Sequence, residues 1–114
     1  MKDVVVAVRS SPLTTGRVHE ALRMALGMTL SNHRVTVAYT GEGASAALTL
    51  DGDVLHRPGL TESLELFDAC QIREVVEQEA LRPGHRSSVR PRVQPVDHDA
   101  LVGLMAGPAV VIAW

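Results

Sequence analysis

The decisive stretch of this sequence is VVVAVRSSP, residues 4–12, in which five apolar residues run directly into a polar loop. A helical pattern follows over residues 17–30, and a second apolar strand, RVTVAY, follows over 34–39. Two apolar strands joined by a helix are typical of a parallel sheet that is covered on both faces. Ligands of such sheets gather at the carboxyl ends of the strands, so we expect function in the loop over 10–16.

The rest of the sequence supplies three further strands and the helices between them. We expect a short helix over 44–48, a helix over 61–69 and strands over 72–76 and 92–96. Asp97 should cap a further helix, which buries Leu101, Leu104 and Met105. A last strand is expected over 109–114. The last strand is apolar on both faces, so we expect it inside the sheet. The sequence therefore predicts a single α/β domain over 1–114, a three-layer fold with a five-stranded, mainly parallel sheet and helices on both faces.

Composition excludes several classes of protein. Hydrophobic residues make up 46% of the chain but aromatic residues only 3%, so the core must be mainly aliphatic. The net charge of -2 argues against a dedicated nucleic-acid-binding protein. Cys70 is the only cysteine, which fits a reducing compartment, and no signal or membrane-spanning stretch is visible. We expect a cytoplasmic protein that does not bind membranes.

The helix over 17–30 has an unusually narrow polar side. Glu20, Arg23, Gly27 and Ser31 form its polar stripe, and most other positions are apolar. Such a helix needs cover on more than the side that faces the sheet. Oligomerisation would supply that cover, and so would neighbouring helices and loops of the same chain.

Four stretches in order along the chain resemble the DsrE/DsrF-like sulfur-relay family, most closely its DsrF/TusC-like branch. They are RSSP (9–12) with Thr15 and EAL (20–22), the strand end and acidic-Gly pair over 39–43, the helix, strand and turn over 66–81, and the closing helix and strand over 97–114. The resemblance implies a small α/β subunit of an intracellular sulfur-transfer system. Its partners would be copies of itself or DsrE/DsrH-like subunits, in a trimer or hexamer.

The same resemblance implies that the chain is a non-catalytic subunit. Carriers of the family have a cysteine just after the third strand, which accepts sulfur as a persulfide. Here Glu77 and Gln78 occupy that place, and neither a carboxylate nor an amide can replace a thiolate nucleophile. A further departure is Thr14, where relatives usually carry glycine.

Two alternative functions remain open. Cys70 could itself carry a persulfide, although it follows a helix C-terminus, whose partial negative charge disfavours a thiolate unless Arg73 offsets it. The simpler interpretation of Cys70 is a half-buried cysteine that behaves as a small apolar residue. The other alternative is a small-anion or nucleotide-binding oligomeric module at the strand ends. Its candidate residues are Ser10, Ser11, Thr14, Thr15, Gly16, Gly41, Gly43, Glu77, Gln78 and Trp114.

Simpler interpretations accompany these site residues. Thr14 or Thr15 could merely cap the following helix, and a Walker-type lysine is missing, so nucleotide hydrolysis is not supported. Trp114 could fill a crevice or an interface between subunits. An acidic partner, a phosphate or tRNA could dock at the arginine-rich stretch over 82–92, or this stretch could form a solvated loop. The five histidines lack metal-ligand spacing, so we expect neither a metal nor a cofactor.

Overall fold

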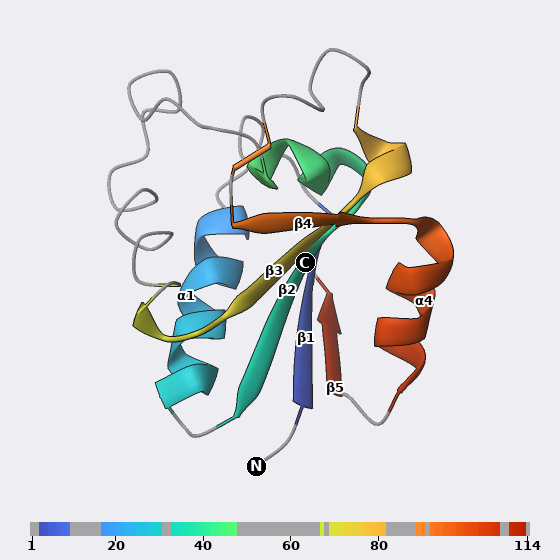
Figure 1. The fold of residues 1–114 in the computed structure, drawn as a ribbon. Helices are drawn as coiled ribbons and strands as arrows, with labels where there is room; N and C mark the ends of the chain where they lie inside the picture. Colours follow the sequence, from blue (N-terminus) through green and yellow to red (C-terminus); the bar gives the residue numbers. More distant parts are fainter. Residues whose placement is uncertain are drawn as a thin grey trace, which may run out of the picture.

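The computed structural model describes residues 3–9, 17–30, 33–47, 67, 69–81, 89–90, 92–107 and 110–113. Its centre is one five-stranded sheet (Figure 1). The strands are β1 (Asp3–Val8), β2 (Arg34–Tyr39), β3 (Arg73–Glu77), β4 (Val93–Val96) and β5 (Val110–Ala113). They lie in the order β4-β3-β2-β1-β5, and every pair of neighbours is parallel. The predicted α/β fold is confirmed, with a sheet that is wholly parallel.

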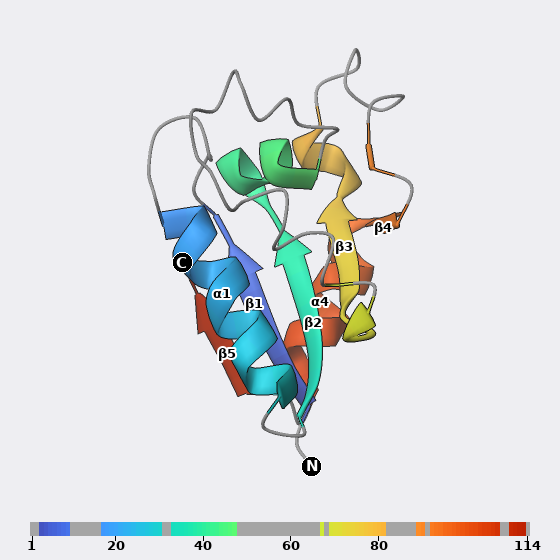
Figure 2. The ribbon, with the colours of Figure 1, turned by 90° about the vertical axis from the view of Figure 1, so that its left-hand side faces the viewer.

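Helices lie on both faces of this sheet (Figures 1 and 2). Helix α1 (Arg17–Leu30) covers one face, and α4 (His98–Ala106) covers the other, which we call the α4 face. Two short 3₁₀ helices, η1 (Gly41–Ala47) and η2 (Gln78–Ala80), directly follow β2 and β3. They therefore lie at the carboxyl edge of the sheet, where ligands of parallel sheets usually bind.

Alternation of side chains along each strand divides the core into two layers. Val4, Val6 and Val8 of β1 pack in a cluster with Leu22 of α1. Val5 points the other way and belongs to a cluster formed with residues of β2, β3 and α4. Both sets are buried, which explains why β1 is an uninterrupted apolar run rather than an alternating one.

The helix predicted after Asp97 is confirmed as α4. The Asp97 side chain caps it by accepting a hydrogen bond from the backbone N–H of Ala100 at 2.7 Å. Leu101 is buried, while Leu104 and Met105 are partly buried against the same cluster. The predicted helix over 61–69 lies mostly outside the described residues, but Phe67 near its end is buried.

The prediction that the last strand lies inside the sheet is wrong. β5 pairs with β1 and stands at the end of the strand order. Val110 and Val111, which point to opposite faces, remain 43% and 42% exposed. A strand that is apolar on both faces indicates cover above and below, but it does not say whether a further strand lies beside it.

The narrow polar stripe of α1 is confirmed where it is described. Ala21, Leu22 and Ala25 are buried, whereas Glu20 and Arg23 are exposed. Cover of this helix by another subunit stays a prediction. None of the helices in the described part of the chain combines the length and hydropathy needed to cross a bilayer.

Candidate functional site

Backbone hydrogen bonds join the ends of β1 and β2 at the carboxyl edge. The N–H of Thr40 donates to the carbonyl of Val8 at 3.0 Å, and the N–H of Gly43 donates to the carbonyl of Thr40 at 3.0 Å. A Cβ on Gly43 would overlap the backbone of Val8, so only glycine allows η1 to lie this close to β1. Gly41 has a φ of +55°, which glycine adopts without strain. The two glycines thus determine the path of the backbone from β2 into η1, at the carboxyl edge of the sheet.

Glu77 is the central side chain of the site. It ends β3 on the α4 face, and its side chain is only 14% exposed. Oε1 accepts a hydrogen bond from Thr40 Oγ1 at 3.0 Å, and Oε2 lies 2.8 Å from Nδ1 of His98. The end of β2, the end of β3 and the start of α4 therefore meet at one carboxylate.

His98 is the titratable partner of this carboxylate. The hydrogen bond to Glu77 and then the negative charge of Glu77 raise the pKa of His98 above its ordinary value, with smaller contributions from Asp99 and Glu79. The imidazole remains 66% exposed, so it can exchange its proton with solvent or contact a partner. This pair can hold and release a proton, or bind a cationic or hydrogen-bonding group, but it contains no sulfur nucleophile.

The structure brings together four of the predicted site residues. Gly41, Gly43, Glu77 and Gln78 all lie at the carboxyl edge, where exposed Gln78 donates weakly to Glu79 Oε1 at 3.5 Å. The other predicted residues lie outside the described part of the chain; they are Ser10, Ser11, Thr14, Thr15, Gly16 and Trp114.

Sequence reasoning missed Thr40 and His98. Thr40 directly follows a strand, which is a signal that could have identified it. His98 lies 21 positions from Glu77 in the sequence, directly after the capping residue Asp97, and no local pattern links the two. Only the position of α4 beside the end of β3 brings it to Glu77.

Cys70 lies before β3, at the opposite edge of the sheet. The five residues of β3, at a rise of about 3.3 Å each, place about 13 Å between the Cα atoms of Arg73 and Glu77, and Cys70 lies farther still. Its side chain is partly buried against the α1 cluster. Cys70 is therefore not part of the carboxyl-edge site.

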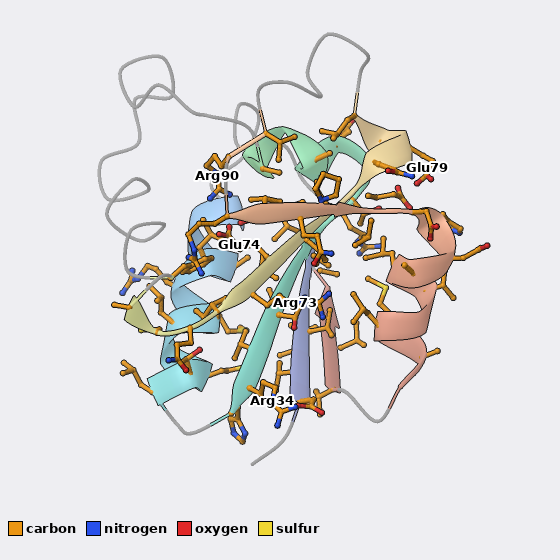
Figure 3. The ribbon with its side chains drawn as sticks, viewed as in Figure 1. Arg34, Arg73, Glu74, Glu79 and Arg90 are labelled. Atoms are coloured by element: carbon orange, nitrogen blue, oxygen red, sulfur yellow. The ribbon has the colours of Figure 1, made fainter. Side chains whose placement is uncertain are left out.

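A second polar cluster is buried on the α1 side of the sheet. The Tyr39 hydroxyl donates to Glu74 Oε1 at 2.7 Å, and Nη2 of Arg90 lies 2.9 Å from the same oxygen. Both Tyr39 and Glu74 are almost fully buried, and Arg90 also lies over the Tyr39 ring, 5.7 Å from its centroid. Figure 3 shows Arg90 beside Glu74. The cluster joins β2, β3 and the segment before β4, so its role is to hold the fold.

Two arginines of the predicted basic stretch consequently point inward. The Arg90 side chain is 15% exposed, and Arg92 lies 3.8 Å from Glu74 Oε2 while donating to the carbonyl of Ile72 at 3.1 Å. The interpretation as a solvated loop is wrong for Arg90. Residues 82–88 lie outside the described part. Among the described residues, no group of three His, Cys, Asp or Glu side chains is placed to hold a metal ion.

Comparison with known proteins bears on the fold. No protein-family model and no curated sequence matches the chain. The ychN protein from E. coli has a similar crystal structure, with a TM-score of 0.77 over 100% of both chains and 15% sequence identity. At this identity the likeness shows that the two chains share a fold.

Proposed function

We propose that this chain is a DsrF/TusC-like, non-catalytic subunit of an intracellular sulfur-transfer system, which assembles with DsrE/DsrH-like, cysteine-bearing subunits. One observation carries the proposal. The family's carriers have a cysteine just after the third strand, where this chain has Gln78 directly after Glu77, the last residue of β3; Thr40 and His98 hold the Glu77 carboxylate.

The contacts of Glu77 suit a docking surface better than a catalyst. A carboxylate fixed by two partners is preorganised to accept one further hydrogen bond from a neighbouring chain. Exposed His98 and Gln78 flank it and offer polar contacts. A sulfur carrier docking here would meet a hydrogen-bonding surface that cannot accept its sulfane sulfur.

The position of Cys70 supports the same conclusion. Sulfur carriers need a thiolate that a donor can reach, whereas this thiol packs partly against the apolar core at the far edge of the sheet. A partly buried cysteine in such surroundings behaves as a small apolar residue.

Sulfur loading followed by intact mass spectrometry tests the proposal. The chain, its Cys70→Ala variant and a Glu77→Cys, Cys70→Ala double variant are incubated with a cysteine desulfurase and cysteine. We expect no added sulfur on the first two and one added sulfur on the double variant. A sulfur on the wild-type chain that the Cys70→Ala variant loses would overturn the proposal in favour of a carrier.

Assembly is tested separately by native mass spectrometry with a DsrE-like subunit. The proposal expects a mixed complex that Glu77→Lys weakens at least tenfold, because the substitution reverses the charge at the docking surface. Glu20→Lys, on the exposed side of α1, is the matched control. Failure of every cysteine-bearing DsrE-like and DsrH-like subunit to form a complex would refute the partnership.

A further inference from the structure

The amino edge of the sheet, opposite the site described above, contains a hollow on the α4 face. Its volume is about 290 Å³, and it lies between the strand starts and the last turns of α4. The described residues that line it are Asp3, Val4, Val5, Arg34, Thr36, Arg73, Gly103, Leu104 and Gly107. The volume is close to the lower end of the range for small-molecule sites.

Parallel register brings the charged residues of this hollow together. Asp3 pairs with Arg34 across β1 and β2, and Thr36 pairs with Arg73 across β2 and β3. Asp3, Arg34, Thr36 and Arg73 all fall on the α4 face, because they share the strand alternation of Val5 and Val75. Figure 3 shows Arg34 at this end of the sheet. Two arginines against one aspartate leave the lining with a formal charge of +1.

The two guanidinium groups retain donors for a ligand. Arg34 Nε lies 3.4 Å from Asp3 Oδ1, in a pair whose side chains are 72% and 49% exposed. Arg73 Nη2 donates to Gln94 Oε1 at 3.3 Å. Each guanidinium has five N–H donors, and the described contacts engage only part of them. Arginine in this arrangement favours bidentate binding of phosphate or carboxylate.

Gly103 of α4 and Gly107, which directly follows this helix, line the hollow without side chains. Gly103 and Gly107 form the helix side of its wall, and a Cβ on Gly103 would have no atom within 4 Å. Glycine in the middle of a helix destabilises it relative to alanine. No turn or close approach explains glycine at 103, whereas space for a ligand does. Val5 and Leu104 supply an apolar floor.

We propose that this hollow binds a small organic oxyanion, a phosphate monoester or a carboxylate on a short alkyl chain. Arg34 and Arg73 bind its charged group, and Val5 and Leu104 contact its apolar part. The site is independent of Glu77 and of the sulfur-transfer proposal, because it lies at the other edge of the sheet.

Calorimetric titration with butyl phosphate, butyrate and the neutral control butanol tests this site at constant ionic strength. We expect one of the two anions to bind with a Kd of 1 mM or tighter and butanol to bind at least tenfold more weakly. The anion that binds more tightly shows whether the hollow prefers a phosphate or a carboxylate. Absence of binding by both anions at 20 mM, or equal binding of butanol, would overturn the proposal.

Variants then locate the binding. Arg73→Gln should raise the Kd of the anion at least tenfold, whereas Arg23→Gln, at an exposed position on α1, should leave the Kd unchanged. Gly103→Leu should abolish binding by filling the hollow, and its folding is checked by circular dichroism. Because leucine is a better helix former than glycine, this variant should fold at least as well as the wild type. Anion binding that survives Gly103→Leu would refute the location.

Discussion

Neutralising Glu74 should destabilise the protein severely, because its carboxylate is the centre of the buried cluster with Tyr39 and Arg90. In Glu74→Gln the shape is kept, but the charge that compensates Arg90 is lost. Removing one partner of a buried ion pair costs about 3–5 kcal/mol. Arg90 keeps some contact with water at 15% exposure, so we take the lower end, about 3 kcal/mol.

That free energy converts into a measurable change in melting temperature. Unfolding entropy of about 2.1 cal/mol/K per residue gives about 240 cal/mol/K for 114 residues, so a loss of 3 kcal/mol lowers Tm by about 12 °C. Thermal unfolding followed by circular dichroism at pH 7 measures it. Glu79→Gln, at an exposed position labelled in Figure 3, is the control and should move Tm by less than about 2 °C.

A double variant separates the ion pair from mere loss of packing. Replacing Glu74 and Arg90 together by leucine removes both charges, so the double variant should be more stable than Glu74→Leu alone. If Glu74→Gln melted within about 2 °C of the wild type, the cluster would not hold the fold as we argue.

Three further predictions concern single residues. Burial, and next the charge of Glu74, raise the pKa of Tyr39, the only tyrosine of the chain, so the stability of the fold should fall as the pH rises above about 10, the ordinary tyrosine value. Phenolate absorbance should then appear only together with loss of the circular dichroism signal. Reversible titration of the phenol near pH 10 in the folded protein would contradict this burial. Since Glu77 raises the pKa of His98, the ion pair stabilises the fold fully below about pH 6.5 and loses its effect as the pH rises through the raised pKa. An NMR titration should show a lower His98 pKa in Glu77→Gln than in the wild type. An unchanged His98 pKa would exclude the contact. Gly43→Ala should lower the free energy of unfolding in urea by about 1–3 kcal/mol, because its Cβ would overlap the backbone of Val8. Gly27→Ala, whose Cβ has no atom within 4 Å, should raise the free energy of unfolding by about 0.5–1 kcal/mol. Equal effects of the two substitutions would contradict the close approach at Gly43.

Much of the fold could be predicted because its signals are local. A continuous apolar run at residues 4–8, a mainly apolar strand at 34–39 and a helical pattern between them indicate a covered parallel pair, and Asp97 marks the start of α4. The order of the strands is not local. The apolar run that became β5 carries no mark of an edge, so its exposed Val110 and Val111 could not be predicted.

The candidate site was predictable only up to the strand ends. Glu77 and Gln78 follow from the position of the third strand, and Gly43 follows from the turn after the second. The partnership of His98 with Glu77 depends on how α4 returns across the sheet, over 21 positions of sequence separation. Glu74 would be expected on a solvated face from its charge alone, yet it is buried because Tyr39 and Arg90 satisfy its oxygens.

Polar residues have different roles on the two faces of the sheet: on the α1 side they stabilise the fold, and on the α4 side they are placed to bind other molecules. On the α1 side, the Tyr39–Glu74–Arg90 cluster is largely buried and the oxygens of Tyr39 and Glu74 are paired within it, so it fixes β3 and the segment before β4. On the α4 side, polar groups lie at both edges and remain reachable: Glu77 with His98 at one edge and the two arginines at the other. Because one helix, α4, contributes His98 at its start and Gly103 near its end, a shift of α4 along the sheet would alter both places at once. An anion bound at the amino edge also raises the His98 pKa directly through its charge, an effect that salt screens, so a change in the His98 titration with butyl phosphate or butyrate that persists at high ionic strength indicates that α4 moves.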